Sequence, residues 1–368
     1  MCIIKLIFIK LKVVNSILIL KLFYAMRLSE LVYLLFLCLF LGSCKQHNEP
    51  YKIYDADSNV IKVGEKVKSL DIEEKDISIF GIPYVLNKYL IISDYKSPDK
   101  LIHIFDKHTF DYITSVGDLG VGPGEIANMG SIVSNEKENT FYVIDHGRQK
   151  ILGFQIDSVL CNADYKPVEV STINRAEFPS NFQYINDTLA FSQFIKRLDN
   201  GDYKPVAAKW NMKTGETVFM DYTGHPLIER KRVSFASSAK YGIYIEAYWY
   251  HDLMSLCSLD GNLKCNLYGT QWNDRTSNED GYFNAVAFCG DKIIASYLGG
   301  KRFSEGQGEP KVNYPKKFLV FDLAGNHLAT LDVGIPMFSF CYDADHNRII
   351  MAFDNEIQFG YLDLDGLL

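Results

Sequence analysis

The chain has 368 residues, with 38 Lys or Arg against 45 Asp or Glu, so its formal net charge is −7. Hydrophobic residues make up 48% and charged residues 23% of the chain, which excludes disordered, collagen-like and coiled-coil proteins. The 23 Tyr and 24 Phe, against three Trp, favour short strands over helices. A chain of this length buries one large core or two ordinary ones.

The first recognisable element is a secretory signal. Residues 31–41 (LVYLLFLCLFL) form an apolar run that follows Arg27 and ends at Leu41-Gly42-Ser43-Cys44. A basic start, a short apolar run and small residues before the cleavage point are typical of such signals, whereas a membrane-spanning helix needs about 20 apolar residues. The last four residues resemble the lipobox of bacterial lipoproteins, which implies cleavage before Cys44 and acylation of its thiol. The alternative interpretation is a chance cysteine after a signal peptide, or a short buried helix.

These features predict four segments along the chain. Residues 1–25, interrupted by four lysines, are a misassigned extension if the natural start is Met26, or otherwise a long basic leader. Residues 26–43 are the lipoprotein signal peptide, 44–58 a tether and 59–368 the folded domain. Removal of the first 43 residues takes away five basic residues and one acidic residue, so the net charge changes from −7 to −11. A domain with this negative charge does not attract nucleic acid or anionic lipid. We therefore expect no nucleic-acid partner, and attachment to the membrane through acyl chains.

The remaining cysteines predict no disulfide framework. Their number is odd and no Cys-x-x-Cys pair occurs, so we expect small buried hydrophobic residues, although an exported compartment permits disulfides. The five are Cys161, Cys257, Cys265, Cys289 and Cys341.

Six copies of one unit follow, each an apolar segment, a polar turn and a second β-rich segment. The units begin at residues 79, 131, 181, 235, 284 and 338, and their second strands are centred on Leu90, Tyr142, Leu189, Tyr244, Ile293 and Ile350. A second hairpin of alternating apolar residues lies between consecutive copies, at 101–117, 207–224, 253–269 and 318–334. Such alternation bounded by Asp, Asn and Gly turns is the hairpin signature. The hairpin expected from Ile151 is degenerate.

Two hairpins per unit predict an all-β fold, a six-bladed β-propeller of four-stranded blades. Each small sheet has two faces to bury and only its neighbours to bury them against. The last unit is one strand short, with a strand at 357–363 and the end of the chain at Leu368. We therefore expect residues 59–72 to supply the missing outer strand of the last blade and to remove the loose edge.

The chain thus resembles the exported six-bladed propeller lipoproteins of the TolB-like or NHL-like type. The resemblance rests on residues 41–44, on the six repeats and on Gly117-Asp-Leu-Gly-Val-Gly-Pro-Gly-Glu125. It implies a lipid-anchored protein of the bacterial cell envelope, at the outer membrane, on its periplasmic or surface side. It carries over no catalytic residue, because one fold hosts many functions.

Strand order selects one face of the propeller for binding. Turns within the hairpins are short, whereas connections at the opposite face are long, at 118–130, 195–205, 224–233, 270–283 and 299–315. Long loops on a rigid scaffold are where binding resides. They carry seven candidate ligand-binding residues, which are His146, Arg148, Trp249, His251, Trp272, Arg275 and Arg302. Aromatic rings beside Arg suit a protein, peptide or glycan; alternatively, the two Trp cover blade junctions and the charges are solvated.

Motifs of chemistry are scarce. The sequence contains no Gly-x-Ser-x-Gly, His-Glu-x-x-His or P-loop pattern and no paired metal-ligand spacing, so it predicts no cofactor and no metal. The leading hypothesis is a binding or scaffolding propeller. The alternative is a propeller hydrolase or lyase, with a polar or divalent-ion site at the central channel. Asp94, Asp145 and Asp354, each just after a second strand, would hold that ion.

Overall fold

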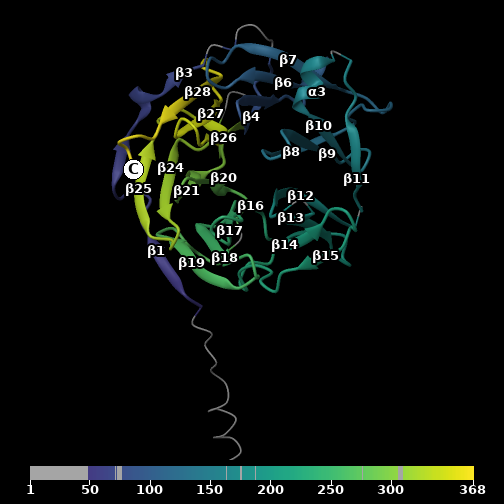
Figure 1. The fold of residues 1–368 in the computed structure, drawn as a ribbon. Coiled ribbons are helices and arrows are strands. Elements are labelled where there is room, and N and C mark those ends of the chain that lie inside the picture. Colours follow the sequence, from purple (N-terminus) through teal and green to yellow (C-terminus); the bar gives the residue numbers. More distant parts are fainter. Residues whose placement is uncertain are drawn as a thin grey trace, which may run out of the picture. The chain divides into compact units, whose positions relative to one another are not determined.

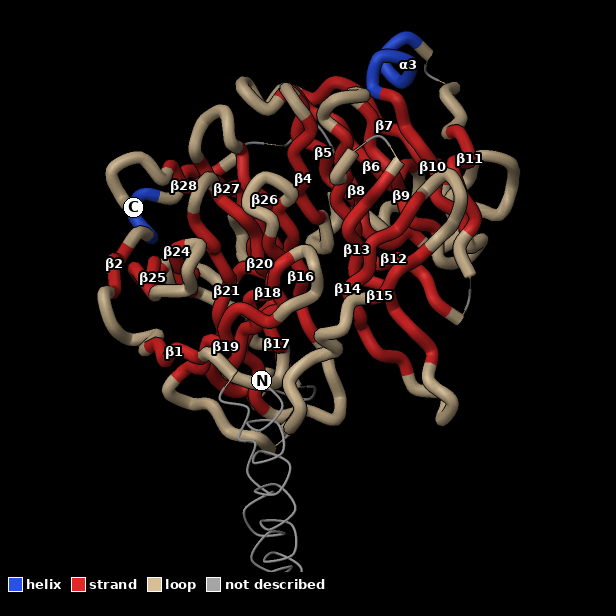
Figure 2. Tube along the Cα trace, turned by 60° about the horizontal axis from the view of Figure 1, so that its bottom comes forward, coloured by secondary structure: helices blue, strands red, loops and turns tan. Residues whose placement is uncertain are grey.

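The computed structural model describes residues 49–368, except residues 71, 73–76, 163, 175, 187, 276 and 306–309. The expected signal peptide and Cys44 lie outside the described residues. Residues Pro50–Leu368 form six β-sheets of four or five strands, set radially around a central axis, and one small two-stranded sheet (Figure 1). Strands provide nearly all of the regular structure (Figure 2). The all-β, six-bladed fold predicted from the repeats is confirmed.

The first three blades are four-stranded, with consecutive strands antiparallel. Blade 1 is β4 (Ile82–Leu86), β5 (Tyr89–Ser93), β6 (Lys100–Asp106) and β7 (Tyr112–Asp118). Blade 2 is β8 (Met129–Asn135), β9 (Thr140–Asp145), β10 (Lys150–Gln155) and β11 (Val168–Thr172). Blade 3 is β12 (Glu177–Tyr184), β13 (Leu189–Arg197), β14 (Tyr203–Asn211) and β15 (Thr217–Phe219).

The last three blades contain the remaining large strands. Blade 4 has β16 (Val233–Ser238), β17 (Ile243–Tyr248), β18 (Leu253–Ser258) and β19 (Leu263–Gly269). Blade 5 has β20 (Asp280–Cys289), β21 (Lys292–Lys301), β24 (Lys317–Asp322) and β25 (His327–Asp332), with a small hairpin of β22 (Phe303–Ser304) and β23 (Lys311–Val312). Blade 6 has β26 (Met337–Asp343), β27 (Arg348–Phe353) and β28 (Phe359–Asp363). Every predicted second-strand centre falls within the second strand of its blade.

The N-terminal segment runs along the outer edges of three blades. β3 (Lys68–Ser69) pairs antiparallel with β28, so the predicted closure of blade 6 is present, although over two residues. β1 (Tyr51–Tyr54) adds a parallel fifth strand to blade 4, and β2 (Val60–Lys62) adds one to blade 5. A short 3-10 helix, η1 (Gly64–Lys66), lies between β2 and β3. The expected tether, residues 44–58, therefore contains a strand of the propeller.

Each junction between blades has its own apolar core, which explains the radial arrangement. Separate buried clusters join blades 1 and 2, 2 and 3, 3 and 4, 4 and 5, 5 and 6, and 6 and 1. Their members come from alternating residues of the central strands, as the period of two along each strand requires. The inner strands of neighbouring blades contact one another around the whole ring.

One blade departs from the expected hairpin. In blade 2 the connection between β10 and β11 contains α3 (Ile156–Cys161), whose Ile156 and Val159 are buried against the core of blades 1 and 2. The Gln155 side chain caps this helix by accepting from the Ser158 amide at 2.7 Å. The helix explains why the repeat from Ile151 is degenerate in sequence. Within the described residues, no helix is both long and apolar enough to cross a bilayer.

Candidate functional site

The inner strands of all six blades converge on one hollow at the long-loop end of the central channel. This mouth cavity has a volume of about 670 Å³, within the range of small-ligand sites. β4, β8, β12, β16, β20 and β26 each contribute to its wall, and the hairpin of β13 and β14 overhangs it. Residues that define it are Tyr84, Ser131, Ser180, Gln193, Tyr203, Arg232, Trp249, Asn284 and Phe338.

β-Bulges shape the wall of the mouth cavity. Four inner strands change register near their first residues, at Met129/Ile132, Pro179/Asn181, Phe283/Val286 and Met337/Ser339. The extra residues left unpaired at these points include Ser131, Ser180, Asn284 and Phe338, and all four line the cavity. Bulges re-aim side chains and end regular pairing, and they are common beside functional sites. The polar lining is thus a property of the backbone at the channel mouth.

The overhanging hairpin supplies a buried amide at the cavity wall. Gln193 is 7% exposed, and its Oε1 accepts from the Ser180 hydroxyl at 3.1 Å. Its Nε2 has no hydrogen-bond partner among the described residues. A buried donor without an acceptor costs about 1–3 kcal/mol. A hydroxyl or carbonyl oxygen on a bound ligand would satisfy this amide.

Trp249 separates the mouth cavity from a second, smaller pocket between blades 4 and 5. The indole is 39% exposed, yet its orientation is fixed, because its Nε1 donates to the Ser234 hydroxyl at 2.9 Å. That hydroxyl donates in turn to the Asn284 carbonyl at 2.6 Å. The other two tryptophans differ: Trp210 is buried, and Trp272 packs against the rings of His225 and His251. Trp249 is therefore a rigid, accessible aromatic surface.

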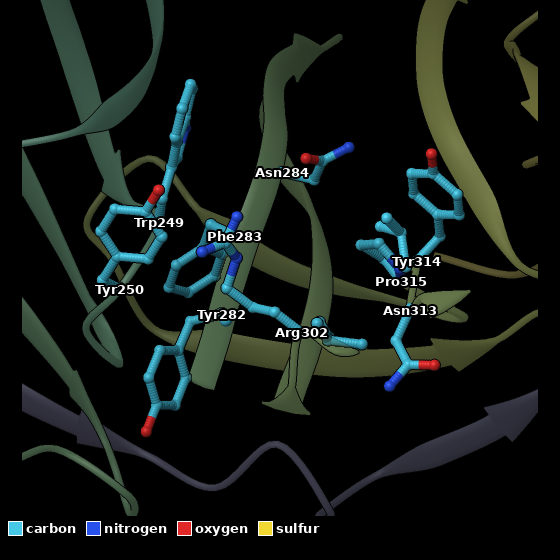
Figure 3. Close-up of a pocket in the computed structure, with 12 residues that line it drawn as sticks. Trp249, Tyr250, Tyr282, Phe283, Asn284, Arg302, Asn313, Tyr314 and Pro315 are labelled. Carbon is cyan, nitrogen blue, oxygen red and sulfur yellow. The ribbon is translucent and has the colours of Figure 1, made fainter. Parts of the chain in front are cut away.

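The smaller pocket has a volume of about 160 Å³ and is rich in aromatic side chains. Figure 3 shows Trp249, Tyr250, Tyr282 and Phe283 on one side and Asn313, Tyr314 and Pro315 on the other. The second group comes from the connection between β21 and β24, which contains the hairpin of β22 and β23. The Asn313 amide donates to the carbonyl of Arg302, directly after β21, at 2.8 Å and so holds this connection against the end of β21.

Arginines flank Trp249 on both sides. Arg302 lines the smaller pocket, and its guanidinium lies 4.8 Å from the centre of the Tyr250 ring. Arg232, which is exposed, lines the mouth cavity. Each guanidinium uses one nitrogen to donate to backbone carbonyls. Arg302 donates to the carbonyl of Asn278, and Arg232 donates to the carbonyls of Tyr203 and Lys231. Among the described residues neither arginine has a carboxylate partner.

A third hollow, of about 550 Å³, lies between blades 2 and 3 and shares Tyr203 with the mouth cavity. His146 lines it, with its ring 5.3 Å from the ring of Phe178. Burial lowers the pKa of His146, so the neutral imidazole is favoured at neutral pH. The predicted residues His146, Trp249 and Arg302 thus line three neighbouring hollows on the long-loop face.

The other predicted binding residues have structural contacts. Arg148 donates through Nη1 to the carbonyls of Gly122 and Glu125, at 2.6 and 3.1 Å, and so holds the Gly-Pro-Gly-Glu turn against blade 2. His251 is 2% exposed, and burial lowers its pKa. Neither side chain lines the mouth cavity, the smaller pocket or the third hollow, so a ligand role for these two residues stays a prediction. Trp272 packs against the apolar cluster at the end of blade 4, and Arg275 is exposed and lines none of the three hollows.

The three aspartates proposed to hold an ion lie at separate turns. Asp94 accepts from the Ser78 amide and hydroxyl, at 2.7 and 2.6 Å, and from the Lys96 amide. Asp145 accepts from four backbone amides, those of Ala127, Asn128, Gly147 and Arg148. Asp354 lies close enough to Tyr314 for its charge to act on the phenol. Burial and the charge of Asp354 together raise the pKa of Tyr314. No described contact brings the three together, and no group of three metal-ligating side chains occurs in the described part of the chain.

Several wall residues escaped prediction. Arg232, Tyr203, Gln193 and Tyr84 reach the mouth cavity only because strands from different blades meet there. Their neighbours in sequence give no such signal, since the approach of these residues depends on how the six blades pack around the ring. Tyr250 also lines the smaller pocket. It directly follows Trp249 in the sequence, so it could have been predicted together with Trp249.

The fold and its hollowed face define a six-bladed β-propeller with a site at the mouth of its channel. The model of the family DUF5128, described as a 6-bladed beta-propeller, matches residues 72–276. This match spans more than half of the chain, so the chain belongs to that family. No curated protein matches it by sequence.

Two solved structures that superimpose on this chain are Bacteroides proteins. A member of the DUF4221 family from Bacteroides vulgatus superimposes with a TM-score of 0.56 at 10% identity, over 80% of this chain and 94% of that chain. A putative exported protein from Bacteroides fragilis superimposes with a TM-score of 0.51 at 12% identity, over 82% and 87%. At such identities the likeness shows the fold alone.

Proposed function

We propose that this propeller is a lipid-anchored binding protein of the bacterial cell envelope that recognises a protein, peptide or glycan through its long-loop face. The observation that carries the proposal is the row of three hollows on that face. The mouth cavity shares Trp249 and Asn284 with the pocket of Figure 3, and Tyr203 with the hollow around His146. Adjoining hollows of this kind suit an extended ligand.

Rigidity supports binding as the role of this face. The walls are strands closed into a ring, and Trp249 is already held by Ser234, so little side-chain entropy is lost when a ligand docks. A divalent-ion site at the channel would need carboxylates that converge there, whereas Asp94 and Asp145 accept hydrogen bonds from turn amides. Binding is therefore the function that the geometry favours.

Arrays of glycans and of peptides, probed with the protein beginning at Lys45, test this role. Ligands of the long-loop face should be lost in Trp249→Ala and kept in Gln183→Ala, because Gln183 lines the opposite end of the channel. Ligands that depend on Gln183, or that bind equally to the Trp249 variant, would contradict the proposal.

Envelope attachment rests on the Leu41–Cys44 sequence and is part of the same proposal, as is the likeness to TolB-like or NHL-like lipoproteins. Cys44→Ser should abolish incorporation of radiolabelled palmitate and move the protein from the membrane fraction to the soluble fraction. Cys38→Ser, inside the proposed signal peptide, is the matched control and should leave both unchanged. Equal labelling of wild type and Cys44→Ser would overturn the anchor.

A further inference from the structure

The charge of the site differs from the charge of the protein. The chain as a whole has a net charge of −7. Among the described residues that line the mouth cavity and the pocket of Figure 3, the charged ones are Arg232 and Arg302, and none is acidic. Two arginines that form no ion pair with a carboxylate of the described residues make an attractive site for a negatively charged ligand, although the protein as a whole is acidic.

The remaining lining suits a ligand with many hydroxyl groups. Ser131, Ser180, Gln193 and Asn284 present neutral donors and acceptors around the mouth cavity, and the Nε2 of Gln193 still needs an acceptor. Between the two hollows stands the fixed ring of Trp249. A flat aromatic face packs against the apolar C–H face of a sugar, while amides and hydroxyls at its edge bind the sugar hydroxyls.

The strand edges argue against an extended peptide. A peptide that binds by β-augmentation needs a regular edge with consecutive free amides and carbonyls. At the mouth cavity this edge is interrupted by bulges in β8, β12, β20 and β26, and β12 has Pro179 at this point. Pro lacks the amide hydrogen that pairing requires. Recognition here therefore runs through side chains.

We propose that the ligand is an acidic oligosaccharide, a chain containing uronic acids. One sugar ring lies on Trp249, and the carboxylates of the sugars on either side are bound by Arg232 in the mouth cavity and by Arg302 in the smaller pocket. Each arginine retains nitrogens beyond the one that its backbone contacts use, and a guanidinium binds a carboxylate through two parallel hydrogen bonds. This assignment rests on the proposed binding role of the long-loop face.

Calorimetric titration of the protein beginning at Lys45 tests the assignment. The probes are the tetramers of galacturonic, mannuronic and glucuronic acid, each against the neutral tetramer of galactose, mannose or glucose with the same linkage. At least one acidic tetramer should bind about tenfold or more tightly than its neutral counterpart, and its affinity should fall as NaCl is raised.

The variants separate the contributions of ring and charge. Trp249→Ala should weaken the acidic tetramer about tenfold or more. Arg232→Met and Arg302→Met should each weaken it about tenfold while reducing the preference over the neutral tetramer. Arg148→Met is the matched control, because Arg148 also donates to backbone carbonyls, but at the 122–125 turn; it should leave the affinity unchanged.

Two results overturn the assignment: the neutral tetramer binds as well as the acidic one, or no acidic tetramer binds. These failures are distinguishable from failure of the binding role itself. If a peptide or neutral glycan from the arrays binds and is lost in Trp249→Ala, the ligand class is wrong and the role of the face stands. If no ligand depends on Trp249, both proposals fail.

Discussion

The junction between blades 6 and 1 is closed by a buried ion pair whose removal should destabilise the whole ring. Asp343, at the end of β26 and fully buried, forms an ion pair with Lys107 of blade 1, with 2.8 Å between Oδ1 and Nζ. It also accepts from Arg348 at 3.0 Å and contacts His346 at 2.7 Å. Lys107 is 2% exposed, so Asp343→Asn would leave a buried ammonium with only the exposed Asp345 as its partner.

Breaking a buried pair by removing one partner costs about 3–5 kcal/mol. We expect the lower end, about 3 kcal/mol, because Asp345 still contacts Lys107 at 2.6 Å. The propeller spans Pro50–Leu368, and an unfolding entropy of about 2.1 cal/mol/K per residue then converts this cost into a loss of roughly 4–5 °C in Tm.

Thermal unfolding followed by near-UV circular dichroism measures this loss. Asp363→Asn is the control at the same end of the ring, because Asp363 pairs with Lys68 at the surface, where solvent screens the interaction; its Tm should stay within error of wild type. The double variant Lys107→Met/Asp343→Asn should be more stable than Asp343→Asn alone, since the buried ammonium is then absent while the new amide oxygen can still accept from Arg348. Equal Tm values for Asp343→Asn and Asp363→Asn would refute the reasoning.

Three further predictions concern pH, the N-terminal strand and the thiols. Burial alone would raise the pKa of Asp343, but the interactions with Lys107 and His346 outweigh burial and lower this pKa. The stabilisation by the charged carboxylate is therefore present above the unfolded pKa of about 4 and is lost as the pH falls through the folded pKa. The difference in Tm between wild type and Asp343→Asn should accordingly become smaller below about pH 4. Asp252→Ala removes the acceptor of the Tyr54 and Tyr297 hydroxyls, at 2.5 and 3.0 Å, and should speed tryptic cleavage after Lys52 of β1, whereas Asp260→Ala, at an exposed pair, should not. In native protein beginning at Lys45, Ellman's reagent should titrate one thiol quickly, that of exposed Cys161, and none in Cys161→Ser; several fast thiols in that variant would contradict the burial of the others.

The repeat pattern predicted the blades because each one depends on local sequence. The alternation in 101–117 or 318–334 is set by residues that pair within the same hairpin, so the strands β6, β7, β24 and β25 lie where the pattern places them. The inner and second strands behave in the same way, because a two-residue turn such as Asn87-Lys88 fixes their register.

The N-terminal strands could be predicted only in part. A missing strand in blade 6 predicted β3, since ring closure needs an outer edge there. β1 and β2 instead add to blades that already have four strands. They pair in parallel with strands far away in the chain, so no short turn between the partners predicts the pairing. The contact that holds β1 in place, from the Tyr54 hydroxyl to Asp252, joins residues 198 positions apart.

The candidate site was also predictable only where it depends on local sequence. Long connections and their aromatic residues predicted a face on which the structure has three hollows, and Trp249 and Arg302 line one of these hollows (Figure 3). Whether an arginine lines a hollow depends on how the loops and strands of different blades meet, and this is why the sequence singled out Arg148, which lines none of the three hollows, and missed Arg232, which lines the mouth cavity. Bulges at the channel mouth depend on the pairing of two strands and leave no signature in either one alone.

A crystal structure of the protein soaked with whichever of the three acidic tetramers binds most tightly tests the central claim most directly. The account predicts a sugar ring stacked on Trp249, with a carboxylate on Arg232 or Arg302 and the chain continuing between the mouth cavity and the smaller pocket. Density at the Gln183 end of the channel, or at the outer rim beside β1, would contradict it, as would an empty long-loop face at saturating ligand.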